Sequence, residues 1–555
     1  MKVRKFARRE SPTPLRQGLR WLGALLAIYI VLILPDRFGG IGSLLSLRLP
    51  LELPLIVLAL IAVTGKPRIV LRTLIVAALT LILIFKLANM AAYFGFARAF
   101  NPLVDALMVP VALDTLGKAG GIGAVVAALA ATVLVVALMV AVFVWATGVF
   151  AHSISRHERL PVAFAALVVA AIGFTPYGTW GASLFARDQV VAILQSLEDA
   201  ASFRAQLLQD PFAQLPLDAR LAKLKGNDVL LIFVESYGRS SLDNPAYASL
   251  LRGTLKKFGA ALEEKGFAAR SAWVTSPTFG GESYLAHSTS VSGLWINNQQ
   301  RYVQLLRSSH DTLISDFNTA GWRTVAVMPE ITTAWPEGDF FSFGKIYRGP
   351  DLQYKGQSFD YLTMPDQYTL AAFQSRELAS VDRAPVMAEI ALVSSHIPWA
   401  PLPKLVPWDE VGDGRIFNTA RTPESANDVW RDPKRVPEFY ALSVDYTLQT
   451  LMSFVTAYAG DNTLLIIVGD HQPMTFIAGE GASHEVPVHI IARNPALLAA
   501  LDEGTWTAGM EPDGTSPSWP MDSLRERILG AFTRRADQSE SPPPEAEPET
   551  PPQQQ

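Results

Sequence analysis

Residues 463–473 read TLLIIVGDHQP, in which an apolar run ends abruptly at Asp470 and His471. Apolar runs of this length without alternation are typical of strands buried on both faces, as in a parallel sheet. Four other such runs occur after residue 186: VLLIFVE (Val229–Glu235), TVAVM (Thr324–Met328), MAEIALVSS (Met387–Ser395) and VPVHIIA (Val486–Ala492). Helical stretches alternate with these runs, so the sequence predicts an α/β domain built on a parallel sheet.

Ionisable residues stand where two of these strands end. Glu235 closes VLLIFVE, and Asp470 and His471 follow TLLIIVG. Ligands of open α/β sheets gather at the carboxyl ends of strands, and carboxylates beside an imidazole can bind a divalent metal. Each signal also has an ordinary alternative. A Glu at a strand end can be solvated or cap a helix, and Gly-Asp-His can form a turn.

A candidate nucleophile lies between these strands, in SPTFGGESYLAHSTSVSGLW (Ser276–Trp295). Gly280 and Gly281 allow close approach of the backbone, and Ser283 begins a stretch with helical character. A hydroxyl at a helix N-terminus gains from backbone N–H groups and the helix dipole, which favour attack on a phosphate. The alternative is that Ser283 is a simple N-cap.

Three further polar residues of this region are weaker candidates. Thr278 precedes the two glycines and is the competing hydroxyl. His287 follows Ser283 by four residues, so it can face the same side of a helix, although a core or supporting position is its ordinary role. Asp366, in MPDQY, is a possible supporting group.

The N-terminal part of the chain has a different composition. Hydrophobic residues make up 50% of the 555 residues and charged residues only 18%, against roughly 25% charged in soluble proteins. The apolar excess lies before about residue 185, and a helix of about 20 apolar residues crosses a bilayer. Five runs approach or exceed that length: Leu19–Pro35, Leu49–Gly65, Thr73–Phe96, Ile122–Phe150 and Leu160–Trp180.

Composition also excludes several protein classes. The formal net charge is −4, without the basic domain of a nucleic-acid-binding protein, so we expect no nucleic-acid partner. The chain has no cysteine, which excludes disulfides, cysteine-ligated zinc, iron–sulfur clusters and a thiol nucleophile.

Flanking charges predict the orientation of the five spans. Basic residues precede the first span and occupy the second-to-third and fourth-to-fifth links, so these segments and the N-terminus are expected to be cytoplasmic. An odd number of spans then places the rest of the chain outside. The predicted parts are a transmembrane domain (1–185), a helical linker (186–225), an extracytoplasmic catalytic domain (226–535) and a disordered, Pro- and Glu-rich tail (536–555).

As a set, these motifs resemble the alkaline phosphatase–sulfatase superfamily. The chain order is Glu235, Ser283, His396 in SSHIPW, Asp470–His471, then His484 in SHEVPVHI. With five spans ahead of it, this order looks like the membrane-bound branch of lipoteichoic acid synthases, phosphoglycerol transferases and phosphoethanolamine transferases. The resemblance implies a sulfatase-like α/β catalytic domain.

The resemblance implies a metal site and a nucleophile. Glu235, Ser283, Asp470 and His471 match the family's metal-binding residues, and Ser283 matches the nucleophile, which in this family is usually Thr. The expected cofactor is a divalent ion, with Mn, Mg and Zn all open. The formylglycine motif of sulfatases proper is not present after Ser283, where Tyr284 to His287 read YLAH.

The resemblance also implies substrate contacts. His396 and His484 match histidines that contact the substrate phosphate or hold a second metal. Trp335, in TTAWPEGDFF, looks like the Trp that lies against the head group in lipoteichoic acid synthases. Those enzymes carry an Arg shortly after it, whereas this chain has Pro336 and Glu337. This departure weakens the case for phosphoglycerol. A carboxylate at Glu337 would suit a cationic ethanolamine; the alternative is that Glu337 points to solvent.

The implied function is metal-dependent transfer of a phospholipid head-group phosphate, as phosphoglycerol or phosphoethanolamine, through a phospho-Ser intermediate. The acceptor would be an extracytoplasmic glycan or lipid, and the enzyme would be a multi-pass protein of the bacterial cytoplasmic membrane. Two alternatives remain open: a sulfatase- or phosphodiesterase-type hydrolase with the same site, and a non-enzymatic membrane sensor or transporter.

Overall fold

The computed structural model describes residues 14–46, 48–152, 159–173, 177–216, 219–359, 361–380, 382–501 and 505–534. The chain divides into two compact units. One comprises Met1–Arg204, Asn298–Arg301 and Met474–Phe476, and the other comprises Ala205–Asn297, Tyr302–Pro473 and Ile477–Gln555. The predicted tail, residues 536–555, lies outside the described residues.

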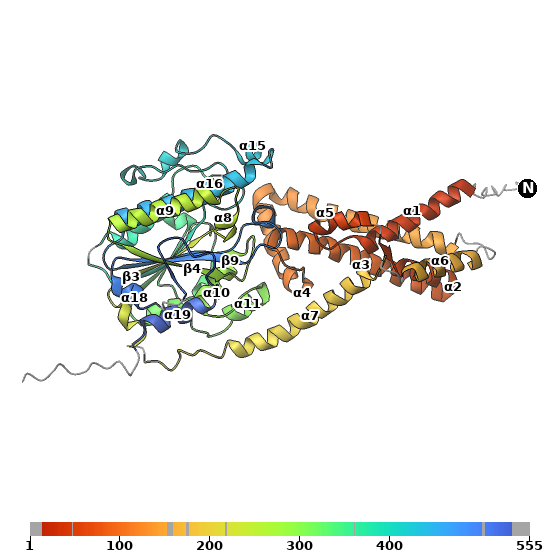
Figure 1. The fold of residues 1–555 in the computed structure, drawn as a ribbon, viewed down its shortest axis with the longest axis horizontal. Coiled ribbons are helices and arrows are strands. Elements are labelled where there is room, and N and C mark those ends of the chain that lie inside the picture. The colour runs from red at the N-terminus through yellow and green to blue at the C-terminus, as the bar shows by residue number, and fades with distance from the viewer. Residues whose placement is uncertain are drawn as a thin grey trace, which may run out of the picture. The chain divides into compact units, whose positions relative to one another are not determined.

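The first unit is built from apolar helices (Figure 1). Among the described residues, three helical stretches are long and apolar enough to cross a membrane. They lie in α1 (Pro14–Ile33), in α3 (Lys66–Phe96) and, as Gly120–Ala151, in α5 (Val109–His152), which is broken at Gly121. Helices α2 (Glu52–Ala62) and α6 (Arg159–Gly173) are shorter. At 1.5 Å per residue they rise only about 16 and 22 Å, less than the roughly 30 Å hydrocarbon core. The predicted number of five spans is therefore not confirmed.

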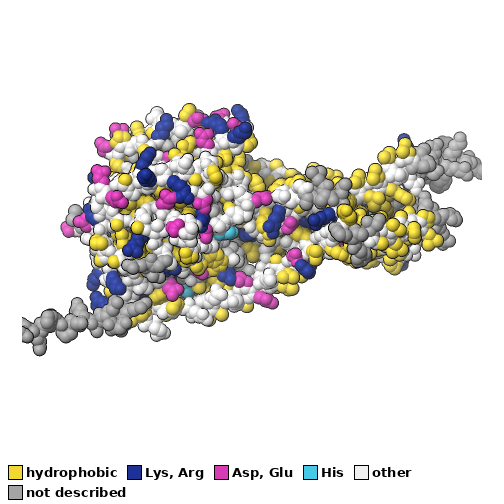
Figure 2. Space-filling view, in the orientation of Figure 1, with side chains coloured by type: hydrophobic (Ala, Val, Ile, Leu, Met, Phe, Trp, Pro, Cys, Tyr) yellow, Lys and Arg dark blue, Asp and Glu magenta, His cyan; other side chains and the backbone are white. Residues whose placement is uncertain are grey.

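Apolar side chains cover the outside of this unit as well as its interior. Figure 2 shows hydrophobic side chains spread over these helices, including exposed Leu74 and Leu81 on α3 and Val133 on α5. Such an exterior suits lipid rather than water. The remaining elements are η1 (Phe38–Ser46), β1 (Leu49–Pro50), α4 (Pro102–Asp105), η2 (Ala106–Met108), β2 (Gly178–Thr179) and α7 (Gly181–Gln206).

The second unit contains a nine-stranded sheet in the order β10-β4-β9-β8-β3-β7-β5-β6, with β11 beside β4. All five predicted strands are present, with ends that differ from the prediction by at most three residues. The strands are β3 (Asp228–Val234), β4 (Ala268–Thr275), β5 (Arg323–Met328), β6 (Lys345–Arg348), β7 (Val386–Leu392), β8 (Thr463–Gly469), β9 (Glu485–Ala492), β10 (Thr507–Ala508) and β11 (Trp519–Pro520).

The sheet is mixed, which corrects the prediction of a parallel sheet. Strands β6, β5, β7, β3 and β8 run parallel, but β9 is antiparallel to both β8 and β4. Strand β9 is buried along nearly its whole length. The continuous apolar run Val486–Ala492 therefore reports burial on both faces and carries no information about direction.

Helices cover both faces of the sheet: α9 and α16 lie over one face and α10 and α19 over the other (Figure 1). In α9, the buried residues Leu251, Leu255, Phe258 and Leu262 recur at helical spacing and form the face that packs on the core. Burying each such side chain contributes roughly 1.5–3 kcal/mol. The helices are α8 (Ser240–Asp243), α9 (Ala248–Glu264), α10 (Ser283–Ser292), α11 (Gln299–Leu306), α12 (Leu313–Thr319), α13 (Gly349–Leu352), α14 (Asp366–Phe373), α15 (Ala426–Trp430), α16 (Arg435–Tyr458), α17 (Thr475–Ala478), α18 (Pro495–Ala499) and α19 (Ser523–Phe532).

Candidate active site and metal centre

The register of three parallel strands brings the polar strand ends together. Val234, the last residue of β3, lies opposite Gly469 of β8 and Leu392 of β7. The residues that follow, Glu235 and Asp470, therefore leave neighbouring strands at the same edge of the sheet. This edge is where open α/β sheets bind their ligands.

The loop before α10 is tied to the segment after β8. The Gly280 N–H donates to the Gln472 carbonyl at 2.9 Å. Gly280 has a φ of +72°, a backbone angle that residues other than glycine rarely adopt. Glu282 occupies the N-cap position and Ser283 is the first residue of α10. The N-cap interpretation of Ser283 is therefore wrong, and its hydroxyl points to the strand ends instead.

Three side chains, those of Glu235, Asp470 and His471, converge on the Ser283 hydroxyl. Its Oγ lies 3.1 Å from Glu235 Oε2 and 3.1 Å from His471 Nε2. His471 Nε2 is also 3.5 Å from Asp470 Oδ2 and 3.6 Å from Glu235 Oε1. His471 Nδ1 donates to the Gln472 carbonyl at 2.8 Å. Because a carbonyl only accepts, Nδ1 carries a proton, and in the neutral form of the ring the Nε2 lone pair is directed at Ser283 and the carboxylates.

Burial and charge set the ionisation of the two carboxyl groups in opposite directions. Burial and the nearby charge of Glu235 raise the pKa of Asp470. Burial alone would also raise the pKa of Glu235, but the charges of His471 and His396 and a hydrogen bond from Ser236 lower it to about 2. Two ionised carboxylates so close together require a compensating positive charge.

The donor set fits a divalent metal ion. Glu235, Asp470 and His471 are all buried, and each offers one ligand atom within 4.8 Å of the others. Two carboxylate oxygens, an imidazole nitrogen and the adjacent Ser283 hydroxyl form a mixed oxygen–nitrogen set that suits Zn, Mn or Mg. The positive charge of such an ion would balance the two carboxylates.

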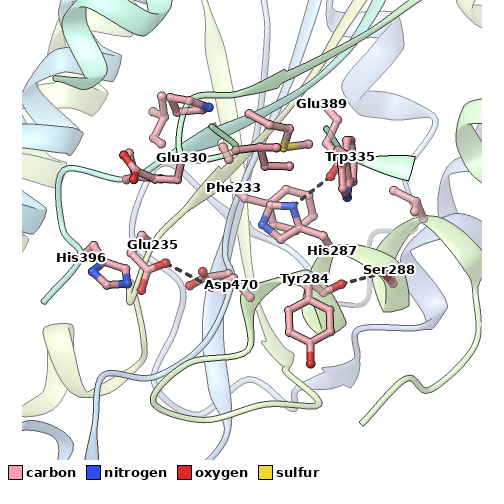
Figure 3. A pocket seen from close by; sticks show the side chains of 18 of the residues that line it. Phe233, Glu235, Tyr284, His287, Ser288, Glu330, Trp335, Glu389, His396 and Asp470 are labelled. Carbon is pink, nitrogen blue, oxygen red and sulfur yellow. Dashed lines mark hydrogen bonds and ion pairs between the residues drawn. The ribbon is translucent and has the colours of Figure 1, made fainter. Parts of the chain in front are cut away.

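A cavity of about 360 Å³ opens from this centre. Figure 3 shows Glu235, Asp470 and His396 on one side of the view and Trp335 and Glu389 on the other, with His287 between. Among its described lining residues there is no Lys or Arg. Aromatic side chains form much of the wall: Phe233, Tyr284, Tyr302, Trp335, Phe341, Phe343 and Tyr361.

His396 is a predicted substrate residue that the structure brings to this cavity beside the candidate metal ligands. It is exposed, and its Nδ1 donates to the carbonyl of Ile397 at 2.6 Å. Nε2 is therefore the ring nitrogen that remains for a contact with a substrate. Buried Asp366 fixes the chain just before it. Its Oδ1 accepts from Val393 N at 2.8 Å and Ser394 N at 3.0 Å. Asp366 thus holds the segment that presents His396.

The other three predicted substrate residues are placed differently. Trp335 lines the cavity and stacks on Phe341, with ring centroids 6.2 Å apart. Glu337, in the short helix Pro336–Asp339, is not among the described lining residues. Nor is His484, which packs on Phe279 at 5.3 Å and whose pKa is lowered by burial. The structure therefore places two of the four, His396 and Trp335, on the cavity wall.

The cavity also holds a buried pair that sequence reasoning missed. His287 Nδ1 lies 2.9 Å from Glu389 Oε1, and the imidazole stacks on Phe233 with ring centroids 3.7 Å apart (Figure 3). Glu389 lies in the middle of β7 and is buried. The signal was present in the sequence, because a carboxylate inside the apolar run MAEIALVSS needs a partner when it is buried.

Glu330 is a second lining residue that sequence reasoning missed. It follows strand β5, where TVAVM ends, and so obeys the same strand-end rule as Glu235. Its Oε1 accepts from Thr363 N at 2.7 Å, which holds the carboxylate at the cavity.

Comparisons with known proteins give similarity at the level of structure. No protein-family model matches the sequence, and no curated protein matches it. Similar solved structures include the lipoteichoic acid synthase LtaP from Listeria monocytogenes (11% identity, 60% of this chain and 78% of that chain, TM-score 0.35). A protein in the alkaline phosphatase superfamily from Vibrio parahaemolyticus shares 15% identity (60% and 74% covered, TM-score 0.37).

A third is the phosphoglycerol transferase GacH from Streptococcus pyogenes, in complex with sn-glycerol-1-phosphate (13% identity, 60% and 82% covered, TM-score 0.38). At this degree of likeness, an assignment of function depends on the site's own residues. These three similar structures are of a lipoteichoic acid synthase, an alkaline phosphatase-superfamily protein and a phosphoglycerol transferase.

Proposed function

We propose that this chain is a membrane-anchored phosphotransferase of the alkaline phosphatase superfamily that moves a phospholipid head-group phosphate to an extracytoplasmic acceptor. The observation that carries the proposal is the position of Ser283 Oγ, 3.1 Å from both Glu235 and His471 at the start of α10. A hydroxyl held by a metal-type donor set at a helix N-terminus and beside a cavity suits nucleophilic attack on phosphorus.

In the first half-reaction, the Ser283 hydroxyl gives up its proton to solvent and its Oγ attacks the head-group phosphorus as an alkoxide, the form in which the second half-reaction returns it. The new Ser–O–P bond forms as the P–O bond to diacylglycerol breaks. His396 stands at the cavity and can give a proton to the leaving glyceride oxygen. A divalent ion bound by Glu235, Asp470 and His471 would lower the pKa of the Ser283 hydroxyl and neutralise phosphate charge.

In the second half-reaction, an acceptor hydroxyl attacks the phospho-Ser diester and restores Ser283. The proton of the acceptor hydroxyl passes to His396, which returns to its starting protonation state for the next turnover. Water in place of the acceptor would give hydrolysis by the same steps. The aromatic wall disfavours bulk water at the reacting centre, which favours transfer.

The membrane domain places the enzyme at its donor. We propose five spans across residues 1–185, with the N-terminus in the cytoplasm, a linker over 186–225 and the catalytic domain, 226–535, outside. The short helices α2 and α6 would then be the second and fifth spans. An extracytoplasmic enzyme has no access to ATP, so a lipid that already carries a phosphodiester is a suitable donor.

The experiment uses the purified full chain in liposomes of phosphatidylethanolamine and phosphatidylglycerol with a soluble glycan acceptor. Lipid mass spectrometry should show diacylglycerol release that depends on a divalent ion, together with a phosphorylated acceptor. Free phosphoethanolamine or phosphoglycerol with unmodified acceptor would establish a hydrolase instead. Absence of diacylglycerol from both lipids would contradict the proposal.

A further inference from the structure

The first unit contains a cavity of its own, of about 440 Å³, that the proposed chemistry does not use. It lies where three helices meet: the end of α1 with the turn after it, the second half of α3 and the first turns of α7. Its size falls within the range of small-ligand sites, about 300–1,000 Å³.

The charge of the cavity is positive. Its lining includes the cations Arg37, Arg48 and Lys86 and the carboxylates Asp36 and Asp188. Both carboxylates already have partners. Asp36 Oδ2 accepts from Asn89 Nδ2 at 3.2 Å, and Asp188 Oδ1 accepts from Arg187 at 2.7 Å. Asp188 is thus paired with Arg187, and three cations remain in the lining against the single carboxylate of Asp36, so the cavity keeps a net positive charge.

Lys86 is the most buried of these cations, at 3% exposed. Its ammonium donates to the carbonyls of Val31 and Leu32 at 3.0 Å each, in the last turn of α1. An ammonium has three N–H donors, so one remains beyond the two bonds that cap α1. Capping of α1 would explain why Lys86 is at the cavity, but it would not explain the presence of Arg37 and Arg48 there.

Two further groups at the cavity lack a complete set of partners. The guanidinium of Arg48 forms no hydrogen bond or ion pair with the part of the chain that the structure describes, whereas Arg37 is held by the Tyr93 hydroxyl at 2.7 Å and stacks on its ring. Gln189 is about nine-tenths buried, and its amide oxygen has no partner among the described residues. A buried acceptor of this kind requires a donor.

The position of the cavity along the helices defines the ligand. In the proposed orientation, α1 runs outward, so its last turn and Lys86 lie in the outer leaflet region. The wall also includes apolar Leu32, Ile33, Leu184 and Phe185. Cations beside apolar surface at this depth match a lipid phosphate with its acyl chains.

We infer that this cavity binds the phosphodiester of an outer-leaflet phospholipid, with Lys86 and Arg48 on the phosphate oxygens and Gln189 accepting from a donor on the head group. The site concentrates the lipid class that the proposed reaction consumes. The inference rests on the proposed orientation of the membrane domain, but lipid binding is measurable without any turnover.

The test measures lipid retention by native mass spectrometry of the full chain, purified in detergent and incubated with dioleoyl phosphatidylglycerol or dioleoyl phosphatidylethanolamine. Arg48 is exposed, so Arg48→Gln should fold normally. It should lower retention roughly ten-fold, as expected for loss of one charge-assisted contact. Lys86→Met should lower retention at least as much. Arg20→Gln, which removes an exposed charge near the other end of α1, is the matched control and should retain lipid as wild type does.

Three results would overturn the inference. If wild type and Arg48→Gln retained the same amount of lipid, the cavity would not be a lipid site. If Arg20→Gln lost as much lipid as Arg48→Gln, the lipid would be held only by unspecific attraction to basic surface. Competition by glycerol phosphate at the same concentration as the lipid would assign the site to a free phosphate rather than a lipid.

Kinetics separate this inference from the proposed function. With a water-soluble aryl phosphodiester, Arg48→Gln should turn over as wild type does, while its KM for the long-chain phospholipid rises roughly ten-fold. An inactive wild type would contradict the proposed function and leave the retention result standing.

Discussion

Replacing Asp470 with Asn should abolish the response of this protein to divalent metal while leaving its fold intact. Asp470 Oδ1 accepts from Ser236 N at 2.8 Å and His471 N at 2.6 Å. The amide oxygen of Asn can keep both bonds. What the substitution removes is one negative charge from a buried group of three candidate ligands.

The size of the effect follows from linkage. A ligand at 100 times its Kd stabilises the folded state by about 2.7 kcal/mol. For a domain of this size, 1 kcal/mol corresponds to roughly 2–3 °C in Tm. Saturating metal should therefore raise the Tm of the wild type by roughly 5–8 °C, and the Tm of Asp470→Asn by much less.

The pH dependence has a defined sign. Burial and the charge of Glu235 raise the pKa of Asp470 above its ordinary value of 3.8. The metal-free protein therefore loses stability as the pH rises from about 3.8 through the raised pKa. Asp470→Asn lacks this group, so without metal its Tm should exceed that of the wild type at neutral pH and depend less on pH.

The assay is thermal unfolding of the full chain in detergent, followed by intrinsic tryptophan fluorescence with chelator or with added Zn, Mn or Mg. Asp311→Asn, at an exposed carboxylate, is the matched control and should respond as wild type does. A metal-induced rise in Tm for Asp470→Asn as large as that of wild type would refute the assignment of the centre.

Three other predictions concern the cavity and the membrane domain. His287→Ala leaves the buried carboxylate of Glu389 without its 2.9 Å partner and should cost roughly 1–3 kcal/mol. Adding Glu389→Gln should restore part of that loss, and chemical denaturation measures the free energy of unfolding of the single and double variants. If the two changes in this free energy were simply additive, His287 and Glu389 would not interact. Glu330→Gln should lower the preference for phosphatidylethanolamine over phosphatidylglycerol by up to about five-fold, whereas Glu337→Gln, outside the cavity lining, should leave the ratio unchanged. If the preference between the two lipids changed only in Glu337→Gln, the assignment of Glu330 rather than Glu337 to the substrate cavity would be wrong. An alkaline phosphatase fusion near residue 200 should be active and one near Arg68 inactive, and the opposite pattern would reverse the orientation.

The core strands could be predicted because burial on both faces leaves a continuous apolar run. The same runs located the carboxyl ends where Glu235 and Asp470 emerge. Direction could not be predicted, since β9 is as apolar as its parallel neighbours. Strand β4 was missed because Arg270 and Ser271 interrupt its pattern; the Ser271 hydroxyl lies 2.8 Å from His489 Nδ1.

The centre of the site was predictable and its walls were not. Ser283 stands out through the glycines before it, and strand ends indicate its neighbours. Cavity walls come from residues far apart in the chain, such as Glu330 and Tyr302, whose proximity depends on tertiary packing. The pairing of His287 with Glu389 could not be predicted for the same reason, because α10 and β7 are separated by about 100 residues.

The most direct test of the central claim is the position of a trapped phosphoryl adduct. Wild-type protein incubated with phospholipid and no acceptor, then quenched in acid, should carry the head-group phosphate on the peptide Ser271–Arg301. Fragmentation should place it on Ser283. Ser283→Ala should carry none, and Ser283→Thr should keep some adduct. Thr278 is buried outside the described cavity lining, so an adduct on Thr278, or normal turnover by Ser283→Ala, would contradict the account.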